Sequence, residues 1–452
     1  MELHPLLVLA IAIGVVFLLI IRMKINAFLA LITAATVVGV LSSRVPLGEV
    51  MPEVASAFGR VCGGVAIVIA LAALIGQCLM ESGAADKIVR VFVRSLGEKN
   101  ASISLLSSGY VLSVPVFFDT VFYLLVPLAR AMRVRTGKNY LLFLMAISAG
   151  GAVTHSMVPP TPGPLAMADT LGIDLGTMIL VGSLVGIPMS IAGWLFANLR
   201  NSQLDIPMRE TAGMTLEELE ELSRKQEDQL PSFFMSMLPI VLPVLFITSN
   251  TLTGALGIEG PIANLTGFFG NPNFALLVST IVAMYLLIKQ KGVSLAGLQG
   301  TVETALASGG LIILITAGGG SFGGMLQLAG VGDVLRDMSA DFGVPLLMLA
   351  FLLGALLKVA QGSGTVSMIT TSAIMAPMVL QGLPFNAVYV ACAIGSGSLV
   401  GSWMNDSGFW IYTKMSGLTE AESLKTWTPL LAILGLTGYV VSQILAIVLP
   451  LQ

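Results

Sequence analysis

The sequence predicts an all-α polytopic membrane protein made of two inverted-topology repeats, each with a re-entrant hairpin and a broken transmembrane helix. Three observations lead to this prediction. Of the 452 residues, 56% are hydrophobic and only 10% are charged, against roughly 25% charged in soluble domains. Apolar runs long enough to cross a bilayer recur along the whole chain. Their order repeats in the second half, where the flanking charges predict the opposite orientation.

Composition also excludes several classes of function. The net charge is −3 and there is no basic arm, so we expect no nucleic-acid partner. The three cysteines, Cys62, Cys78 and Cys392, lie in apolar segments without metal-ligand spacing. We interpret them as small buried hydrophobic residues rather than as a disulfide or metal set. The glycine run 318–320 lacks the Lys-Ser/Thr of a phosphate loop. We expect neither a metal nor a cofactor.

The first predicted repeat, residues 1–200, opens with three spans. They are expected at about 5–21, 26–43 and 61–79, with a helix along the outer membrane surface at about 46–59. Basic residues mark cytoplasmic loops, and Arg22 and Lys24 follow the first span, so the N-terminus is predicted to be external. The 46–59 segment alternates acidic and apolar residues at helical spacing. It is too short and too polar to cross, which favours the interfacial position.

The apolar segment at about 101–128 has basic clusters on both sides. These are Lys87, Arg90, Arg94 and Lys99 before it and Arg130, Arg133, Arg135 and Lys138 after it. Both ends should therefore lie in the cytoplasm. Two crossings would need about 40 apolar residues, more than the segment holds, and Ser113, Pro115 and Asp119 interrupt it. We predict a re-entrant hairpin, whose irregular tip must lie inside protein or beside a watery cavity.

The next crossing, at about 140–169, is predicted to be a broken span. Four prolines between positions 159 and 164 cannot continue an α-helix. A further span is expected at about 175–199. The hydrophilic residues 201–230 form a predicted cytoplasmic linker, in which Thr215 and Glu218 make a capping box for a short helix.

Residues 231–452 form the second predicted repeat. Its elements are spans at about 231–249, before Lys289, at 309–328 and at 429–449, a hairpin at about 344–380 and a broken span at about 386–412. Glycine-rich sequences split the hairpin at 360–365 and the broken span at 395–408. The C-terminus is predicted to be external. Inverted repeats with broken elements are typical of secondary transporters, which we expect here in the plasma (inner) membrane.

Four motifs stand at the predicted breaks. They are Thr154-His155 through Val158-Pro159-Pro160, Pro162-Gly163-Pro164, Val359-Ala360-Gln361-Gly362-Ser363 and Asn405-Asp406-Ser407-Gly408-Phe409-Trp410. They resemble the motifs of the gluconate:proton symporter family of the ion transporter superfamily. The resemblance implies proton-driven uptake of small hydroxylated carboxylates such as gluconate, and a homodimer in which a mobile part carries the hairpins. The sequence departs from the family at Thr161 and at Ser402-Trp403-Met404, where members often carry a His, so the transported acid stays open.

Polar residues near the tips and breaks are the candidates for binding this small anionic substrate. They are Ser113, Asp119, Thr120, Thr154, His155, Thr161, Gln361, Ser363, Thr365, Ser396, Asn405 and Ser407. Hydroxyl and amide groups beside half-helix N-termini suit an anionic, hydroxylated ligand. Ser and Thr also pack membrane helices together, so a structural role stays open for part of this set.

Four titratable residues are candidates for proton coupling: Asp119, His155, Lys358 and Asp406. Asp119 should lie roughly 16 Å from the cytoplasmic face and Lys358 roughly 21 Å from the external face, beyond snorkelling reach. Lys358 either attracts the substrate or permanently neutralises Asp119 or Asp406. Each carboxylate is either a structural acceptor or a group that holds a proton when unpaired. His155 is either a structural residue or a proton carrier.

The predicted function is therefore alternating-access proton symport of a small hydroxylated carboxylate, and not catalysis. One alternative is a sodium-coupled carrier of an organic or amino acid. A passive channel is a second, although the inverted repeat favours a carrier. The third is an intramembrane hydrolase that would use Ser363 or Ser396 with His155.

Overall fold

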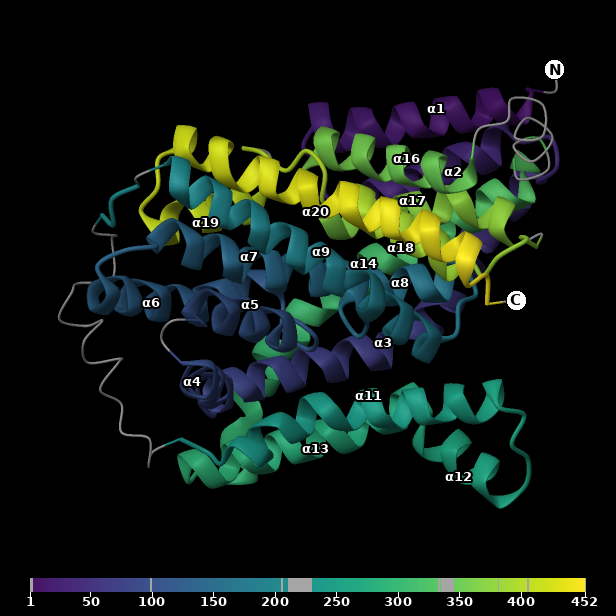
Figure 1. Ribbon diagram of the computed structural model, residues 1–452. Helices are drawn as coiled ribbons and strands as arrows, with labels where there is room; N and C mark the ends of the chain where they lie inside the picture. The colour runs from purple at the N-terminus through teal and green to yellow at the C-terminus, as the bar shows by residue number, and fades with distance from the viewer. Residues whose placement is uncertain are drawn as a thin grey trace.

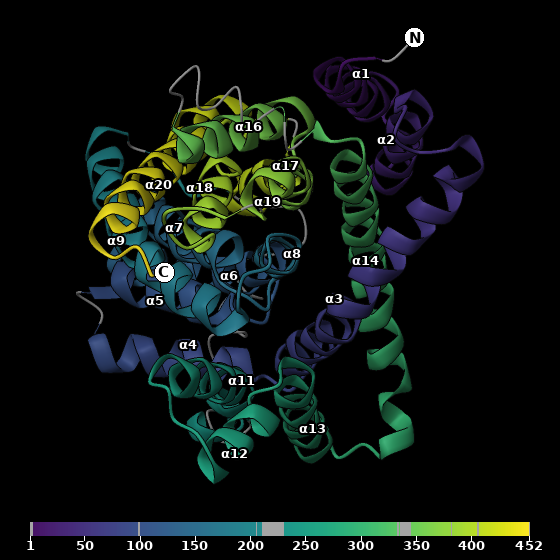
Figure 2. The same ribbon diagram turned by 90° about the vertical axis from the view of Figure 1, so that its right-hand side faces the viewer.

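The computed structural model describes residues 3–97, 100–204, 206–209, 230–331, 334, 345–380, 382–404 and 406–451, apart from the side chains of residues 17, 21, 135 and 361. Every regular element in these ranges is a helix, as predicted. The helices form two groups, which Figures 1 and 2 show from two sides. A frame comes from residues 5–81 and 233–328, and a bundle comes from residues 84–203 and 346–448.

The frame is built around two long helices that cross beside the bundle (Figure 2). It contains α1 (Pro5–Phe17), α2 (Ala27–Leu41), α3 (Val50–Glu81), α11 (Phe233–Ala255), α12 (Pro261–Phe269), α13 (Pro272–Lys291) and α14 (Gln299–Leu328). The long α14 packs against both α2 and α3, and α13 packs against α3. The frame therefore joins the beginning of the chain to its middle.

The separate interfacial helix predicted at 46–59 is wrong. After a 3₁₀ turn at Leu47–Glu49, these residues form the first turns of α3, which continues unbroken to Glu81. Val50 lies against Gly39 of α2 and Ala57 against Gly324 of α14, and both side chains are buried. Packing against neighbouring helices thus extends the helix through a polar segment whose local pattern favours the membrane surface.

The bundle contains the shorter, interrupted helices. They are α4 (Ala84–Leu96), α5 (Ala101–Leu112), α6 (Phe118–Thr136), α7 (Tyr140–Met157), α8 (Pro162–Thr170), α9 (Leu175–Gln203), α16 (Leu346–Gln361), α17 (Gly364–Val379), α18 (Val388–Gly397), α19 (Ser407–Ser416) and α20 (Glu420–Val448). α7 packs against α5, α6, α9 and α20. Every residue of α7 is buried except His155, so this residue is singled out by its position.

The helix interruptions lie where the sequence predicts them. The chain leaves helical structure between α5 and α6, α7 and α8, α16 and α17, and α18 and α19. α5, α16 and α17 have 12, 16 and 16 residues, fewer than the roughly 20 that a crossing needs. The re-entrant position of these helices in a bilayer stays a prediction.

Seven helical segments in the described ranges are long and apolar enough to cross a membrane. They are Leu47–Glu81, Tyr140–Thr170, Leu175–Gln203, Phe233–Ala255, Pro272–Lys291, Leu295–Leu328 and Glu420–Val448. The described residues thus form only helices, and these include enough long apolar helices for a multi-pass membrane protein. A long helix, two interrupted pairs and a last long helix follow one another from α3 to α9, where α4 stands after the long helix, and from α14 to α20 among the described residues. This order agrees with the predicted repeat, whose inverted orientation stays a prediction.

Adjacent glycines let α14 approach three helices at once. Gly318 lies against α2, Gly319 against Ile369 of α17, and Gly320 against Val61 of α3. Successive residues on an α-helix point about 100° apart, so neighbouring glycines face different partners. A Cβ at either Gly319 or Gly320 would clash with the facing side chain. The glycine run therefore fits close helix packing.

A basic helix precedes the first predicted hairpin. The basic residues Lys87, Arg90 and Arg94, which precede the predicted hairpin, lie on the amphipathic helix α4. This helix packs against α5 and α11, because its apolar side chains form one face while its charges form the other. The capping box predicted at Thr215 and Glu218 lies outside the described residues.

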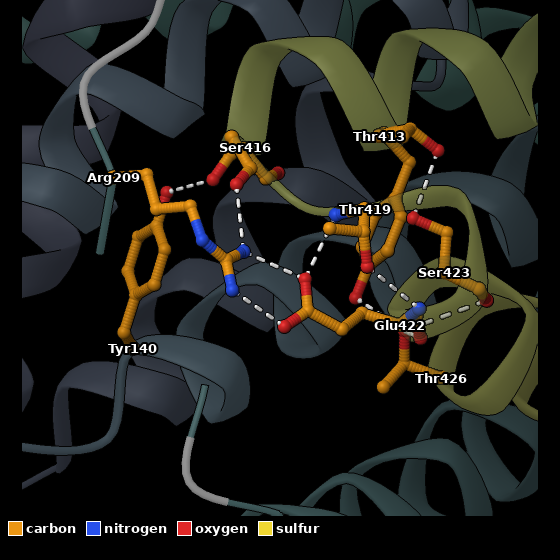
Figure 3. Close-up of polar contacts among 10 residues, drawn as sticks. Tyr140, Arg209, Thr413, Ser416, Thr419, Glu422, Ser423 and Thr426 are labelled. Carbon is orange, nitrogen blue, oxygen red and sulfur yellow. Dashed lines mark hydrogen bonds and ion pairs between the residues drawn. The ribbon is translucent and has the colours of Figure 1, made fainter. Parts of the chain in front are cut away.

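The described part of the linker is tied to the bundle. Both terminal nitrogens of the Arg209 guanidinium donate to the Glu422 carboxylate at 2.7 Å, and one also donates to the carbonyl of Gly417 at 3.1 Å (Figure 3). The buried guanidinium of Arg130 on α6 donates to the carbonyl of Arg209 at 2.6 Å. The beginning of the linker therefore joins α6 of the first half to α20 of the second.

Candidate functional site

A cavity of about 270 Å³ lies where the helix interruptions of the bundle meet α14. Its wall includes the starts of α6, α17 and α19, the ends of α7 and α16, and the middle of α20. Three apolar side chains of α14, Leu311, Ile312 and Ile315, contribute the wall on the frame side. Both halves of the chain, and both the bundle and the frame, therefore share one site.

Three helix N-termini line the cavity, and helix N-termini carry unpaired N–H groups and partial positive charge. Two of them already hold a carboxylate. Asp119 lies in the first turn of α6, and Asp406 is the N-cap of α19. The N-cap of α17 is Ser363, and no acidic residue lies in its first turn. Of the three, the N-terminus of α17 is thus the best suited to bind an anion.

Lys358 and Asp406 form an ion pair in the cavity wall. The Lys358 Nζ atom lies 2.7 Å from Oδ2 of Asp406 and 2.6 Å from the carbonyl oxygen of Gly362. The two residues are only 4% and 7% exposed. The Ser402 hydroxyl also donates to Oδ2, and the backbone N–H of Gly408 donates to Oδ1 at 3.0 Å. Such hydrogen bonds offset the free-energy cost of burying an ion pair. Of the two carboxylates that the sequence offers to Lys358, Asp406 is therefore its partner.

Trp427 on α20 contacts this pair indirectly, through Ser402. Its indole N–H donates to the Ser402 hydroxyl at 2.6 Å. The indole ring packs against Phe118 of α6 and Tyr412 of α19, with ring centroids 5.4 and 5.2 Å apart. Because Ser402 belongs to the interruption between α18 and α19, Trp427 connects three helices to the carboxylate of Asp406.

The other titratable residues that line the cavity, Asp119 and His155, take part in none of the ion pairs of the described residues. Asp119 is the second residue of α6. The His155 ring packs edge-on against Phe117, with centroids 6.2 Å apart. Its Nδ1 atom is buried and finds no hydrogen-bond partner among the residues described. The first half of the chain therefore contributes two titratable groups that form no ion pair with any described residue.

Seven of the predicted site residues line the cavity. They are Asp119, His155, Lys358, Ser363, Thr365, Asp406 and Ser407. Their hydroxyl, carboxyl, amino and imidazole groups come from five helices, α6, α7, α16, α17 and α19, or from the N-caps of these helices, so both halves of the chain contribute. The interruptions thus bring together donors and acceptors in the way that the sequence predicts for a polar ligand.

Five predicted residues lie outside the cavity: Ser113, Thr120, Thr154, Thr161 and Ser396. The hydroxyls of Thr161 and Ser396 donate to backbone carbonyls nearby at 2.5 and 2.7 Å. Those of Ser113 and Thr154 are buried among packed helices, without a partner in the described ranges. These side chains lie away from the cavity although they stand near a tip or an interruption. Asn405 and the side chain of Gln361 lie outside the described residues.

Some lining residues escaped the sequence prediction. Ser398 lies within the predicted 395–408 interruption, which is the signal that could have identified it. Trp427 and the apolar residues of α14 carry no sequence signal that identifies them as cavity residues. A Trp near a span end also marks a membrane interface, and apolar residues on a span normally face lipid or the protein core. Only their placement beside the interruptions identifies them.

Comparison with known proteins agrees with this architecture. The GntP permease family profile matches residues 4–448. The chain is 33% identical over 437 residues to the inner membrane permease YgbN of Escherichia coli K12, covering 94% of each protein. It is 33% identical over 445 residues to the low-affinity gluconate transporter of the same strain, covering 96% of this chain and 97% of that protein.

A solved structure shares the fold. The Alcanivorax borkumensis YdaH transporter aligns with a TM-score of 0.65 at 13% identity, covering 94% of this chain and 98% of that one. At this identity the likeness concerns the fold alone. The family match over nearly the full length identifies the chain as a member of the GntP permease family and as a membrane transporter rather than an enzyme.

Proposed function

We propose that the chain is a proton symporter that carries a small hydroxylated carboxylate, such as gluconate or a related sugar acid, across the inner membrane. The observation that carries this proposal is the cavity in which the N-terminus of α17, the Lys358–Asp406 pair and several hydroxyls face one space. The names of the two relatives, a gluconate transporter and an inner membrane permease, support the substrate class and the membrane.

In this proposal the substrate carboxylate binds at the N-terminus of α17, where the N–H groups and the helix dipole attract an anion. Gly364 adds no side chain there, and a Cβ at this position would lie 3.4 Å from the carbonyl oxygen of Ser398. A Cβ built at this position would lie 3.9 Å from Nζ of Lys358, so the ammonium group is close to the same point. The hydroxyls of Ser363, Thr365 and Ser407 supply donors and acceptors for the hydroxyl groups of the substrate.

The size of the cavity supports a single sugar acid. Its volume of about 270 Å³ lies near the lower end of ligand pockets, which begin at roughly 300 Å³. Phe117, Trp427 and the apolar residues of α14 offer a surface for the C–H groups of the substrate.

Alternating access is proposed because the cavity is shared between the two predicted repeats. Asp119 and His155 come from the first half, and Lys358 and Ser363 come from the second. In transporters built from inverted repeats, the two halves move so that a midplane site opens to either side. This supports a carrier over a channel. The expected homodimer rests on the family resemblance alone.

Transport by the purified protein in liposomes tests the proposal. Labelled gluconate should show saturable counterflow and should accumulate uphill when a proton gradient is imposed without sodium. Flux that never saturates would indicate a channel, and accumulation that requires sodium would overturn proton coupling. Absence of counterflow with gluconate and with other sugar acids would overturn the substrate class.

A matched pair of variants on α17 tests the location of the site. Thr365 lines the cavity, whereas Thr371 lies farther along the same helix, buried outside it. Thr365→Val should weaken gluconate binding by about 0.5–1.5 kcal/mol if one hydrogen bond to the substrate is lost. Thr371→Val should leave the affinity unchanged. Calorimetry that finds equal affinities in the two variants would place the substrate elsewhere.

A further inference from the structure

The charges around the cavity do not balance. The titratable residues that line it are Lys358, Asp406, Asp119 and His155. Lys358 and Asp406 neutralise each other in their ion pair. With His155 uncharged, the carboxylate of Asp119 leaves one uncompensated negative charge. An anionic substrate would therefore enter a cavity that is already negative.

Repulsion between like charges is strong where burial lowers the effective dielectric constant. The N-terminus of α17 offers only a partial positive charge to offset it. A proton taken up at the cavity removes the excess charge, so proton binding and anion binding should strengthen each other. The question is which group accepts this proton.

The two carboxylates of the cavity are held differently. Both oxygens of Asp406 accept hydrogen bonds, from Lys358, Ser402 and the backbone of Gly408, and such contacts stabilise an ionised carboxylate. Asp119 accepts no hydrogen bond from any described residue. A proton on Asp406 would break the ion pair, whereas a proton on Asp119 removes the unbalanced charge and creates an O–H donor toward the substrate.

We propose that Asp119 carries the coupled proton, while Lys358 and Asp406 remain an ionised pair throughout the transport cycle. This assignment rests on the proposed symport function. The proton comes from water on the side where the substrate enters and binds a carboxylate oxygen of Asp119. It leaves to water on the opposite side together with the substrate, whose covalent bonds do not change.

The other titratable groups that line the cavity with Asp119 come from three other helices. They are His155 at the end of α7, Lys358 at the end of α16 and Asp406 at the start of α19. In the described ranges, α5 and α20 bring no titratable side chain to the cavity. Tyr412 of α19 packs on Phe122 farther along α6, and its hydroxyl donates a hydrogen bond to the hydroxyl of Thr426. His155 is therefore the competing proton carrier that an experiment must separate from Asp119.

Calorimetry with gluconate and the full-length protein in detergent distinguishes Asp119 from His155 as the proton carrier. Between about pH 5 and pH 8.5, where gluconate stays ionised, the wild-type affinity should fall about tenfold per pH unit once Asp119 is ionised. Binding in that range should also take up a proton from the buffer. Asp119→Asn should remove both the pH slope and the proton uptake. The matched variant Asp169→Asn, a carboxylate on α8 outside the cavity, should keep both.

An unchanged pH slope in Asp119→Asn overturns the assignment, as does a slope that His155→Gln removes and Asp119→Asn does not. If Asp119→Asn fails to fold, the wild-type protein still decides, because gluconate binding without proton uptake at any pH contradicts a coupled carboxylate. Wild-type protein that binds no sugar acid at any pH overturns the proposed function, and the assignment with it.

Discussion

Lys358 at the end of α16 and Asp406 at the start of α19 are 48 residues apart in sequence, yet their charged atoms lie 2.7 Å apart in the cavity wall. The pair joins the α16–α17 interruption to the α18–α19 interruption. Because both residues are almost fully buried, neither charge can be left alone without a large free-energy cost. We therefore expect these two interruptions to move as one unit.

Removing one partner of this pair should destabilise the protein far more than removing both. Lys358→Met leaves the Asp406 carboxylate buried and uncompensated, which should cost about 3–5 kcal/mol of unfolding free energy. The double variant Lys358→Met/Asp406→Leu replaces both charges with apolar groups and should recover most of this loss. Unfolding curves in detergent provide the measurement. A double variant less stable than the single one would show that the pair itself holds the fold together.

The contact between Arg209 and Glu422 should contribute modestly. The Arg209 side chain is 39% exposed, and ion pairs of this kind are worth about 0.2–1 kcal/mol. A double-mutant cycle with Arg209→Gln and Glu422→Gln should give a coupling energy near the upper end of this range, because both terminal nitrogens bind the carboxylate. The more exposed Lys414–Glu420 pair should show no measurable coupling. Equal coupling in the two pairs would contradict a specific role for the linker contact.

The glycine run of α14 should be intolerant to added volume. A Cβ at Gly320 would clash with Val61, so Gly320→Ala should cost about 1–3 kcal/mol through overpacking. Gly310 on the same helix has open space around it, and Gly310→Ala should be neutral or slightly stabilising because alanine is the better helix former. Thermal stability in detergent compares the two. Similar values would mean that α14 and α3 can separate at little cost.

If the two repeats have opposite orientations, as the sequence predicts, two positions should lie on opposite sides of the membrane. The charge flanks predict that Arg133 lies in the cytoplasm, and that Asn264 lies outside because its loop, residues 250–272, contains no Lys or Arg. In a background without cysteines, single cysteines at these positions should react with a membrane-impermeant reagent from opposite sides of sealed vesicles. Reaction of both from the same side would rule out the inverted repeat.

The helix interruptions could be predicted because their causes are local. Proline removes a backbone donor and clashes with the preceding turn, so α7 ends at Met157 and the helix resumes at Pro162. Hydropathy is also a property of neighbouring residues, so the multi-pass membrane class could be predicted from the sequence. The surface helix at 46–59 is wrong for the same reason, since a local amphipathic pattern does not reveal that Val50 and Ala57 pack into the frame.

The sequence by itself determined the membrane class, the interrupted helices and the polar residues that stand near them, because adjacent residues set each of these. Only the tertiary structure decided that Lys358 pairs with Asp406, and that Asp119 forms no ion pair with any described residue. It also decided that Trp427 and α14 complete the cavity wall, and that Thr154 and Ser396 face packed helices. The rotation of each helix about its axis settles these contacts, and that rotation is the outcome of packing across the whole bundle.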